Sequence, residues 1–179
     1  MMKVLMLNGS SKPNGNTFRS LVEVGEQLKK EGIDYEIFQT GAGPVRDCIG
    51  CGQCTEKGCI FTDDTVNEFV AKAKEADGFV FGTPVYYAHP SGRILSFLDR
   101  AFYSSSSAFS FKPAASVAVA RRGGTTASFD VMNKYFASPR CPWQALLTGI
   151  SLMEEFPERW NRMQRAYRPC GIWQRTWPG

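Results

Sequence analysis

Short apolar runs alternate along the chain with longer segments of helical periodicity, and this alternation predicts the secondary structure. The apolar runs have the residue types of β-strands, and we expect strands at 3–7, 34–38, 77–82 and 115–120. Apolar residues recur on one helical face in the segments between them, which predicts helices at 17–31, 64–76, 92–102 and 125–136. Gly32 is expected to end the first helix and Asp63 to cap the second. Because strands and helices alternate, we expect an α/β fold: a doubly wound, three-layer parallel sheet with right-handed crossovers.

Length and composition are those of one globular domain. The chain has 179 residues, 43% of them hydrophobic and 21% charged, and no stretch approaches the ~20 apolar residues of a membrane span. The N-terminal apolar run stops at Asn8, too early for a secretory signal, so we expect a cytoplasmic protein without a membrane partner. The formal net charge of +4 is not gathered into a basic patch, which argues against a nucleic-acid partner.

The last part of the chain, 139–179, differs from the rest. It holds all four tryptophans, five of the ten prolines and six arginines, but no lysine. A last strand at 142–148 and a helix at 155–167 fit its pattern. Two explanations stay open, a divergent extension and a shifted reading frame, so we assign 1–138 to the main domain and set 139–179 apart.

Open parallel sheets bind ligands at the carboxyl ends of their strands, which points to the loops after the first, third and fourth strands. The first loop, 8–17, joins a strand to a helix and is rich in small and hydroxyl residues. Backbone N–H groups at a helix N-terminus bind phosphate, and the loop lacks the glycine patterns of dinucleotide and nucleoside-triphosphate sites. A monophosphate such as that of FMN therefore fits it, the alternative being a polar turn capped by Thr17.

The other two loops offer groups suited to a flat ring. The segment 82–87 presents Tyr86 and Tyr87 at the carboxyl edge, as a wall for a flavin or simply as cover for a helix end. Arg121 and Arg122 precede two glycines in 121–126 and are candidates for a flavin edge or a nicotinamide phosphate, or for a plain strand end and turn. The convergence of three such loops on one edge favours the flavin interpretation.

Four of the six cysteines lie in a glycine-rich loop at 41–61. A reducing compartment favours metal ligands or free thiols over disulfides. Compact Cys-x₂-Cys-x₂-Cys spacing lets a loop wrap an iron–sulfur cluster, whereas structural zinc usually takes two separated pairs. Three interpretations stay open: a [4Fe–4S] cluster, zinc, and a loop without metal. The candidate ligands are Cys48, Cys51, Cys54 and Cys59.

Three further polar residues have ordinary explanations. His89, the only histidine, follows the second loop and could deliver a proton, but a surface position before Pro90 is the simpler expectation. Asp99 and Arg100 could contribute to a subunit contact, and the default is a local pair on a solvated helix face.

Taken in order, these motifs resemble the NADPH-dependent FMN reductase superfamily, and the cysteine pattern resembles its iron–sulfur flavoprotein branch. The resemblance covers residues 2 to about 136. It rests on Asn8–Ser11 with Asn16–Thr17, the Cys-x₂-Cys-x₂-Cys…Cys segment, Asp63–Asp64, Gly82–Tyr86 and Leu98–Arg100.

The resemblance implies a flavodoxin-like fold of strand order 2-1-3-4-5, with FMN near the interface of a homodimer or homotetramer. It implies that the FMN phosphate is held by Ser10, Ser11, Asn16 and Thr17. It implies a flavin ring along Thr83, Pro84, Val85 and Tyr86, with its far edge near Arg121, Arg122, Gly123 and Gly124. Some relatives in the superfamily keep cysteine-rich loops without a metal.

The expected function is an FMN-dependent NAD(P)H oxidoreductase. Reduced nicotinamide, NADPH or NADH, would deliver hydride to FMN, and electrons would pass to a quinone, free flavin or one-electron acceptor. The hydride step needs no side-chain acid or base, so we name no catalytic residue. Two alternatives remain: a non-enzymatic flavodoxin-like electron carrier with a [4Fe–4S] cluster, and a redox-responsive interaction module.

Overall fold

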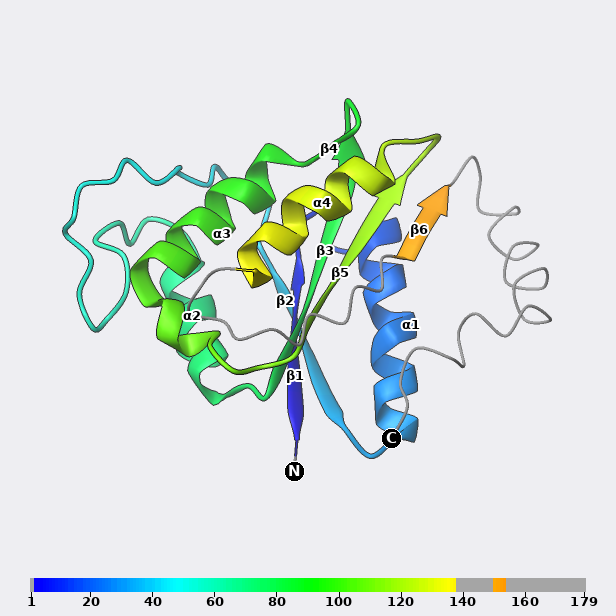
Figure 1. Ribbon diagram of the computed structural model, residues 1–179, viewed down its shortest axis with the longest axis horizontal. Coiled ribbons are helices and arrows are strands. Elements are labelled where there is room, and N and C mark those ends of the chain that lie inside the picture. Colours follow the sequence, from blue (N-terminus) through cyan, green and yellow to red (C-terminus); the bar gives the residue numbers. More distant parts are fainter. Residues whose placement is uncertain (1, 138–149, 154–179) are drawn as a thin grey trace.

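The computed structural model describes residues 2–137 and 150–153, which build a parallel sheet flanked by helices (Figure 1). Five strands follow the order β2-β1-β3-β5-β6 and pair in parallel, which confirms the expected order of the main strands. The additional β4 (His89–Pro90) lies outside this path and pairs antiparallel with the end of β3. The strands of the path are β1 (Lys3–Asn8), β2 (Asp34–Gln39), β3 (Gly78–Tyr86), β5 (Ala114–Ala120) and β6 (Ile150–Met153). The helices are α1 (Asn16–Lys30), α2 (Val66–Glu75), α3 (Gly92–Ser105), the 3₁₀ turn η1 (Ser106–Ala108) and α4 (Thr125–Phe136).

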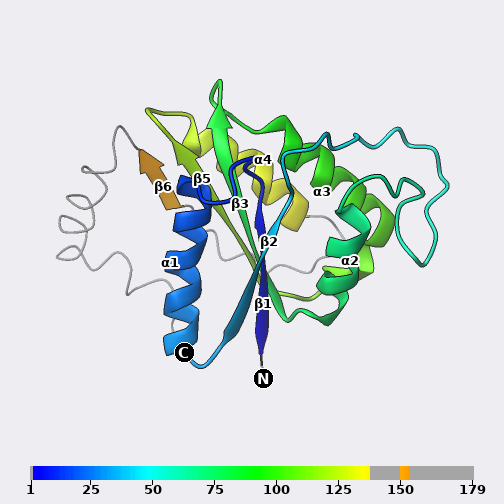
Figure 2. The same ribbon diagram turned by 180° about the vertical axis from the view of Figure 1, so that it is seen from behind.

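The central strands are apolar on both faces because each face is covered by helices. Successive side chains of a strand point to opposite faces. Val4 and Met6 of β1 pack in the core beneath α1, whereas Leu5 and Leu7 pack in the larger core beneath α2, α3 and α4. Figures 1 and 2 show α1 on one face of the sheet and the other helices across it. The doubly wound, three-layer α/β fold predicted from the alternation is therefore confirmed.

Aromatic rings hold the larger core together and fix the position of α3. The Phe69 ring of α2 lies 5.4 Å from that of Phe38 and 5.3 Å from that of Phe97, measured between centroids. Such tilted and edge-on pairs add about 0.5–1.5 kcal/mol each beyond their buried area. Helix α3 therefore packs against both α2 and the sheet.

The predicted elements shift at their ends where tertiary contacts intervene. Strand β3 runs past the predicted end at residue 82 to Tyr86, because its last residues pair with β5 and β4. The prediction that Asp63 caps α2 is wrong: Asp63 pairs with Arg46 at 3.0 Å, and the Asp64 carboxylate accepts from the Val66 N–H at 3.1 Å. Gly32, with φ of +76°, follows the end of α1 as predicted.

The fifth parallel strand comes from the atypical C-terminal part. Strand β6, Ile150–Met153, pairs with the end of β5. The strand predicted at 142–148 and the helix predicted at 155–167 lie outside the described residues. In the part of the chain that the structure describes, no helix has the length and apolar character to cross a membrane.

One ion-pair network joins β1, β2 and α2 and gives a pH-dependent prediction. The Glu36 carboxylate lies 2.6 Å from Lys3 Nζ and 2.8 Å from Lys72 Nζ, and these hydrogen bonds hold the pKa of Glu36 below its ordinary value. A carboxylate of this kind stabilises the fold above its unfolded-state pKa, about 4.3, and loses that contribution as the pH falls through its lower folded-state pKa.

We expect Glu36→Gln to lower the free energy of unfolding by about 1 kcal/mol near neutral pH, since both pairs are partly exposed. The difference from wild type should shrink as the pH falls below about 4. Urea denaturation across this pH range measures it. The control, Glu56→Gln, changes an exposed carboxylate and should leave the stability unaltered; a Glu36 difference that grows on acidification would contradict the assignment.

Candidate functional site

Three loops meet at the carboxyl ends of the parallel strands, and hydrogen bonds join the first two. The Gly9 N–H of the first loop donates to the Gly82 carbonyl of β3 at 2.8 Å. Ser91 Oγ, before α3, donates to the Gly9 carbonyl at 3.2 Å and also accepts from the Ile94 N–H, which caps α3. The first and second loops are therefore parts of one rigid edge.

Two amide side chains shape the first loop from within. Asn8 and Gln39 are register partners at the ends of β1 and β2, and Asn8 Nδ2 donates to Gln39 Oε1 at 2.5 Å. Asn8 Oδ1 accepts from the Ser10 N–H at 3.2 Å, and Gln39 Nε2 donates to the Ser10 carbonyl at 2.7 Å. Ser10 is thus fixed at both of its backbone groups.

The N-terminus of α1 faces this loop. The N-cap residue is Gly15, which supplies no side-chain hydrogen bond, and the first intrahelical bond within the described helix runs from Arg19 N–H to the Gly15 carbonyl. Unpaired N–H groups and the helix dipole together attract an anion. Of the predicted phosphate ligands, Ser10 and Thr17 are buried in the loop and Ser11 and Asn16 are exposed at its surface.

The second loop ends in a tight hairpin that carries the aromatic pair. Thr83 is fully buried, and its Oγ1 accepts from the Ser91 N–H at 3.1 Å and donates to the Pro84 carbonyl at 2.9 Å. Beyond it, Pro84 and Val85 are half-buried and Tyr86 is exposed. Thr83 therefore anchors the loop, and the later residues form its accessible surface.

The hairpin turn itself is formed by Tyr87 and Ala88, whose φ angles are +52° and +58°. Two positive φ angles between antiparallel partners are the geometry of a two-residue hairpin turn. The turn leaves the Tyr87 side chain fully exposed. His89, expected at the surface, is also exposed.

The third loop packs on this hairpin. Gly124 has φ of +90°, and a Cβ there would collide with the backbone of Ala88. Only glycine combines this angle with this close approach. Arg121, Arg122 and Gly123 are exposed beside the hairpin. All three predicted loops thus gather at one edge of the sheet.

The four cysteines of the loop line one pocket beside α3. Cys48, Cys54 and Cys59 are half-buried and Cys51 is exposed, and the pocket also contains Arg100. Burial raises the pKa of the Cys54 thiol, and the neighbouring Cys59, Cys51 and Cys48 raise it further. The four sulfur atoms therefore lie close enough together to interact electrostatically. The remaining lining residues are Ile49, Gly52, Phe61 and Tyr103.

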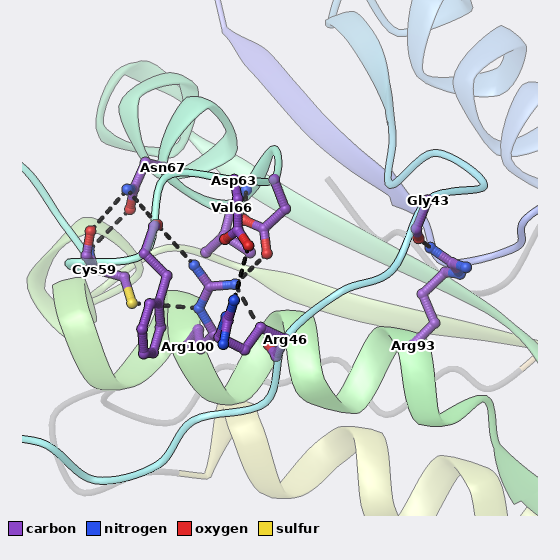
Figure 3. Close-up of polar contacts among 10 residues, drawn as sticks. Gly43, Arg46, Cys59, Asp63, Val66, Asn67, Arg93 and Arg100 are labelled. Atoms are coloured by element: carbon purple, nitrogen blue, oxygen red, sulfur yellow. Dashed lines mark hydrogen bonds and ion pairs between the residues drawn. The ribbon is translucent and has the colours of Figure 1, made fainter.

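Asn67 of α2 holds the last turn of the cysteine loop (Figure 3). Its Oδ1 accepts from the Cys59 N–H at 2.8 Å, and its Nδ2 donates to the carbonyls of Cys59 at 2.8 Å and Phe61 at 3.1 Å. Gly58, with φ of +112°, approaches the Asn67 amide so closely that a Cβ would meet Oδ1 at 2.5 Å. Cys59 is thus positioned by two helices, α2 through Asn67 and α3 through Arg100.

Arg100 corrects a sequence-based expectation. A local pair with Asp99 on a solvated face was expected, but the Arg100 side chain is fully buried and points from α3 into the cysteine loop (Figure 3). It forms an ion pair with the Asp64 carboxylate, and its Nε donates to Cys59 Sγ at 3.3 Å. Burial alone would lower the pKa of Arg100, but the bonds to Cys59 and Asp64 outweigh it and raise that pKa above its ordinary value. Asp99 instead accepts from the Tyr135 hydroxyl at 2.5 Å.

The chemistry of this pocket is that of an all-sulfur donor set. Within 2–137 and 150–153, no group of three or more His, Cys, Asp or Glu side chains surrounds a point where a single metal ion would sit. A cubane cluster differs from a single ion because each thiolate binds a different iron, so its ligands line a wider space. The arrangement thus offers no support for a tetrahedral zinc site, and the assignment of the cysteines as cluster ligands stays a prediction.

Residues 2–145 match the protein family described as NADPH-dependent FMN reductase. The chain belongs to this family. Among curated relatives, an iron–sulfur flavoprotein of Methanocaldococcus jannaschii is 39% identical over 100 residues, which are 55% of this chain and 51% of the relative. An NADPH azoreductase of a Bacillus species is 28% identical over 163 residues, 86% of this chain and 80% of that protein.

The fold is shared with solved oxidoreductase structures. The structure of an NAD(P)H:quinone oxidoreductase from Methanothermobacter marburgensis superposes with a TM-score of 0.65 at 16% identity, covering 93% of this chain and 96% of that one. The chain spans about half the length of the iron–sulfur flavoproteins it matches.

Sequence reasoning missed the roles of four side chains that shape these loops. Asn8 lay inside the first motif, but its partner Gln39 is 31 residues away and is recognised only from the strand register. Asn67 and Arg100 reach the cysteine loop from separate helices, and the one available signal was the Leu98–Arg100 segment within the family motif.

Proposed function

We propose that this FMN reductase family member oxidises NADPH or NADH through a bound FMN and passes the electrons to an acceptor. One observation carries the proposal: three loops from three strands meet at the carboxyl edge beside the uncapped N-terminus of α1. When bound, FMN would take up hydride from the nicotinamide and release electrons singly or as a pair.

The first loop fits a phosphate monoester. The N–H groups that open α1 supply donors and positive potential, and four side chains add hydroxyl or amide donors. Asn8 and Gln39 fix the Ser10 backbone, so the loop is preorganised and loses little conformational freedom on binding. The proposed phosphate ligands are Ser10, Ser11, Asn16 and Thr17.

The second and third loops would bind the ring system. Pro84, Val85 and the exposed Tyr86 and Tyr87 form an apolar, aromatic surface, on which a flat heterocycle can pack. We assign the opposite edge to Arg121, Arg122, Gly123 and Gly124, where exposed guanidinium groups can pair with anionic groups of the flavin or nicotinamide. Thr83 acts by anchoring the loop, because it is fully buried.

The cysteine loop fits an iron–sulfur cluster in its donor set. Cys48, Cys51, Cys54 and Cys59 line one pocket, and we propose that their thiolates hold a [4Fe–4S] cluster. Such a group would exchange single electrons. Helix α3 joins the two sites, since Ser91 at its start contacts Gly9 and Arg100 contacts Cys59.

The acceptor and the assembly are also proposals. The names of the relatives include an azoreductase and a quinone oxidoreductase, which supports a quinone-like or other conjugated acceptor besides free flavin or a one-electron carrier. We propose a cytoplasmic homodimer or homotetramer with FMN near the subunit interface, and residues 1–138 as the FMN-binding domain.

Anaerobic purification and spectroscopy test the function. We expect flavin absorption near 450 nm, about four irons and four sulfides per chain, and saturable bleaching of the flavin by NADPH or NADH. Flavin bleached only by a reduced ferredoxin would favour the non-enzymatic carrier. Failure to bind added FMN would overturn the proposal, and a partner bound only in one cysteine redox state would then favour the interaction module.

A further inference from the structure

Arg100 uses its guanidinium in an unusual way for a buried arginine. Nη1 binds the Asp64 carboxylate and the Arg46 carbonyl, Nη2 donates to the Phe61 carbonyl at 2.9 Å, and Nε donates to Cys59 Sγ at 3.3 Å. All of these partners lie on the cysteine loop or the turn that follows it. A side chain of α3 thus gathers the loop, which Asn67 of α2 also holds.

The contact with sulfur suits a cysteine that serves as a cluster ligand. A neutral thiol is a weak acceptor, whereas a thiolate accepts a charge-assisted hydrogen bond from a guanidinium. Arg100 carries the only cationic side chain among the described residues that line the pocket, and this side chain is fully buried. Inside a protein such a charge is little screened by solvent. The buried N–H is therefore well matched to a sulfur that carries negative charge.

We propose that Arg100 is a positioning residue that donates a hydrogen bond to the Cys59 thiolate and, in balance with Asp64, sets the reduction potential of the cluster in this loop. The inference rests on the proposed function, which places a cluster on the four cysteines. Hydrogen bonds to the sulfurs and nearby charge are main determinants of cluster potentials. Reduction adds negative charge, so the Arg100 N–H and cation favour the reduced state and the Asp64 carboxylate opposes it.

Opposite shifts in two variants separate this role from a merely structural one. Arg100→Lys keeps the charge but loses the planar fork and the Nε donor, so the potential should fall. We expect at least a tenfold change in the oxidised-to-reduced ratio at a fixed potential, about 59 mV for a one-electron couple. Asp64→Asn removes the charge that offsets Arg100, so the potential should rise. A loosened loop would instead admit water in both variants and move both potentials in one direction.

Arg46→Gln is the matched control. Arg46 also lies over the Phe61 ring and pairs with Asp63, but its side chain is about half exposed, and among the described residues no hydrogen bond joins it to a cysteine. At a fixed potential, the oxidised-to-reduced ratio of the cluster in Arg46→Gln should stay within a factor of two of the wild-type ratio. The measurements are EPR-monitored potentiometric titration, with iron and acid-labile sulfide per chain, on full-length protein prepared without oxygen.

The outcomes separate this inference from the proposed function. Wild type without iron would overturn the cluster proposal and this inference with it. Wild type with iron, but with unchanged or same-direction potentials in the two variants, would overturn the role of Arg100 alone. If Arg100→Lys retains no iron, the reduction potential of Asp64→Asn tests the inference by itself. A potential above that of wild type supports the inference, and an unchanged or lower potential overturns it.

Discussion

Replacing Gly9 by alanine should lower the affinity for FMN by about 10- to 100-fold. A Cβ at Gly9 would lie 2.6 Å from Ile94 Cδ1 and 2.9 Å from the Gly82 carbonyl oxygen. The backbone of β3 cannot rotate away as a side chain can, so the first loop must move. Overpacking of this kind costs about 1–3 kcal/mol, and about 1.4 kcal/mol corresponds to a tenfold change in a dissociation constant.

Gly92→Ala is the control for this experiment. Gly92 is the first residue of α3 and lies next to Ser91, but a Cβ there meets nothing within 4 Å. Fluorescence titration of the apoprotein with FMN should give a wild-type dissociation constant for Gly92→Ala and a weakened one for Gly9→Ala. Equal affinities in the two variants would contradict the assignment of the first loop to the phosphate, provided both proteins unfold cooperatively.

The sequence predicted best what depends on local pattern. The run Ala115–Ala120 is small and apolar because both faces of β5 are covered, and the structure confirms it as a strand with one more residue. The helix predicted at 125–136 is confirmed with the same bounds, because the loop glycines before it and the apolar face within it are both local signals.

Long-range contacts account for what the sequence did not reveal. Arg100 follows Asp99 on a helix, a spacing typical of a solvated pair, and nothing local indicates that Cys59 and Asp64 lie beside it. Asp63 looks like a helix cap, but Arg46, 17 residues earlier, takes its carboxylate and α2 starts at Val66. The sequence therefore predicts a surface position for Arg100, which lines the cysteine pocket, and a capping role for Asp63, which pairs with Arg46 instead.

The placement of both groups of contacts on α3 links the two candidate sites. Ser91 at its N-terminus holds the first loop, Arg93 donates to the Gly43 carbonyl, and Arg100 holds Cys59. From Ser91 to Arg100 the helix rises about 14 Å. Because aromatic packing holds α3 against both α2 and the sheet, the cysteine pocket and the loops proposed to bind FMN keep a fixed separation.

Replacing Cys54 by alanine should remove most of the iron without removing the flavin. Cys54 is half-buried in the pocket, and its thiol is close enough to the other three cysteines for each to raise its pKa. Loss of one of four thiolates leaves an iron without its protein ligand, so we expect the iron content to fall from about four per chain to below one.

The loops proposed to bind FMN are held by separate contacts, through Gly9, Ser91 and Gly124, so FMN should still bind at one per chain to Cys54→Ala. Cys170→Ala, which changes a cysteine outside the loop, is the control and should keep both groups. Colorimetric iron and the flavin absorbance of anaerobic samples measure the two contents together. Iron retained in Cys54→Ala but lost in Cys170→Ala would place the cluster elsewhere in the chain. Loss of flavin together with iron would show that the two sites depend on each other, against the independent loops argued from the contacts.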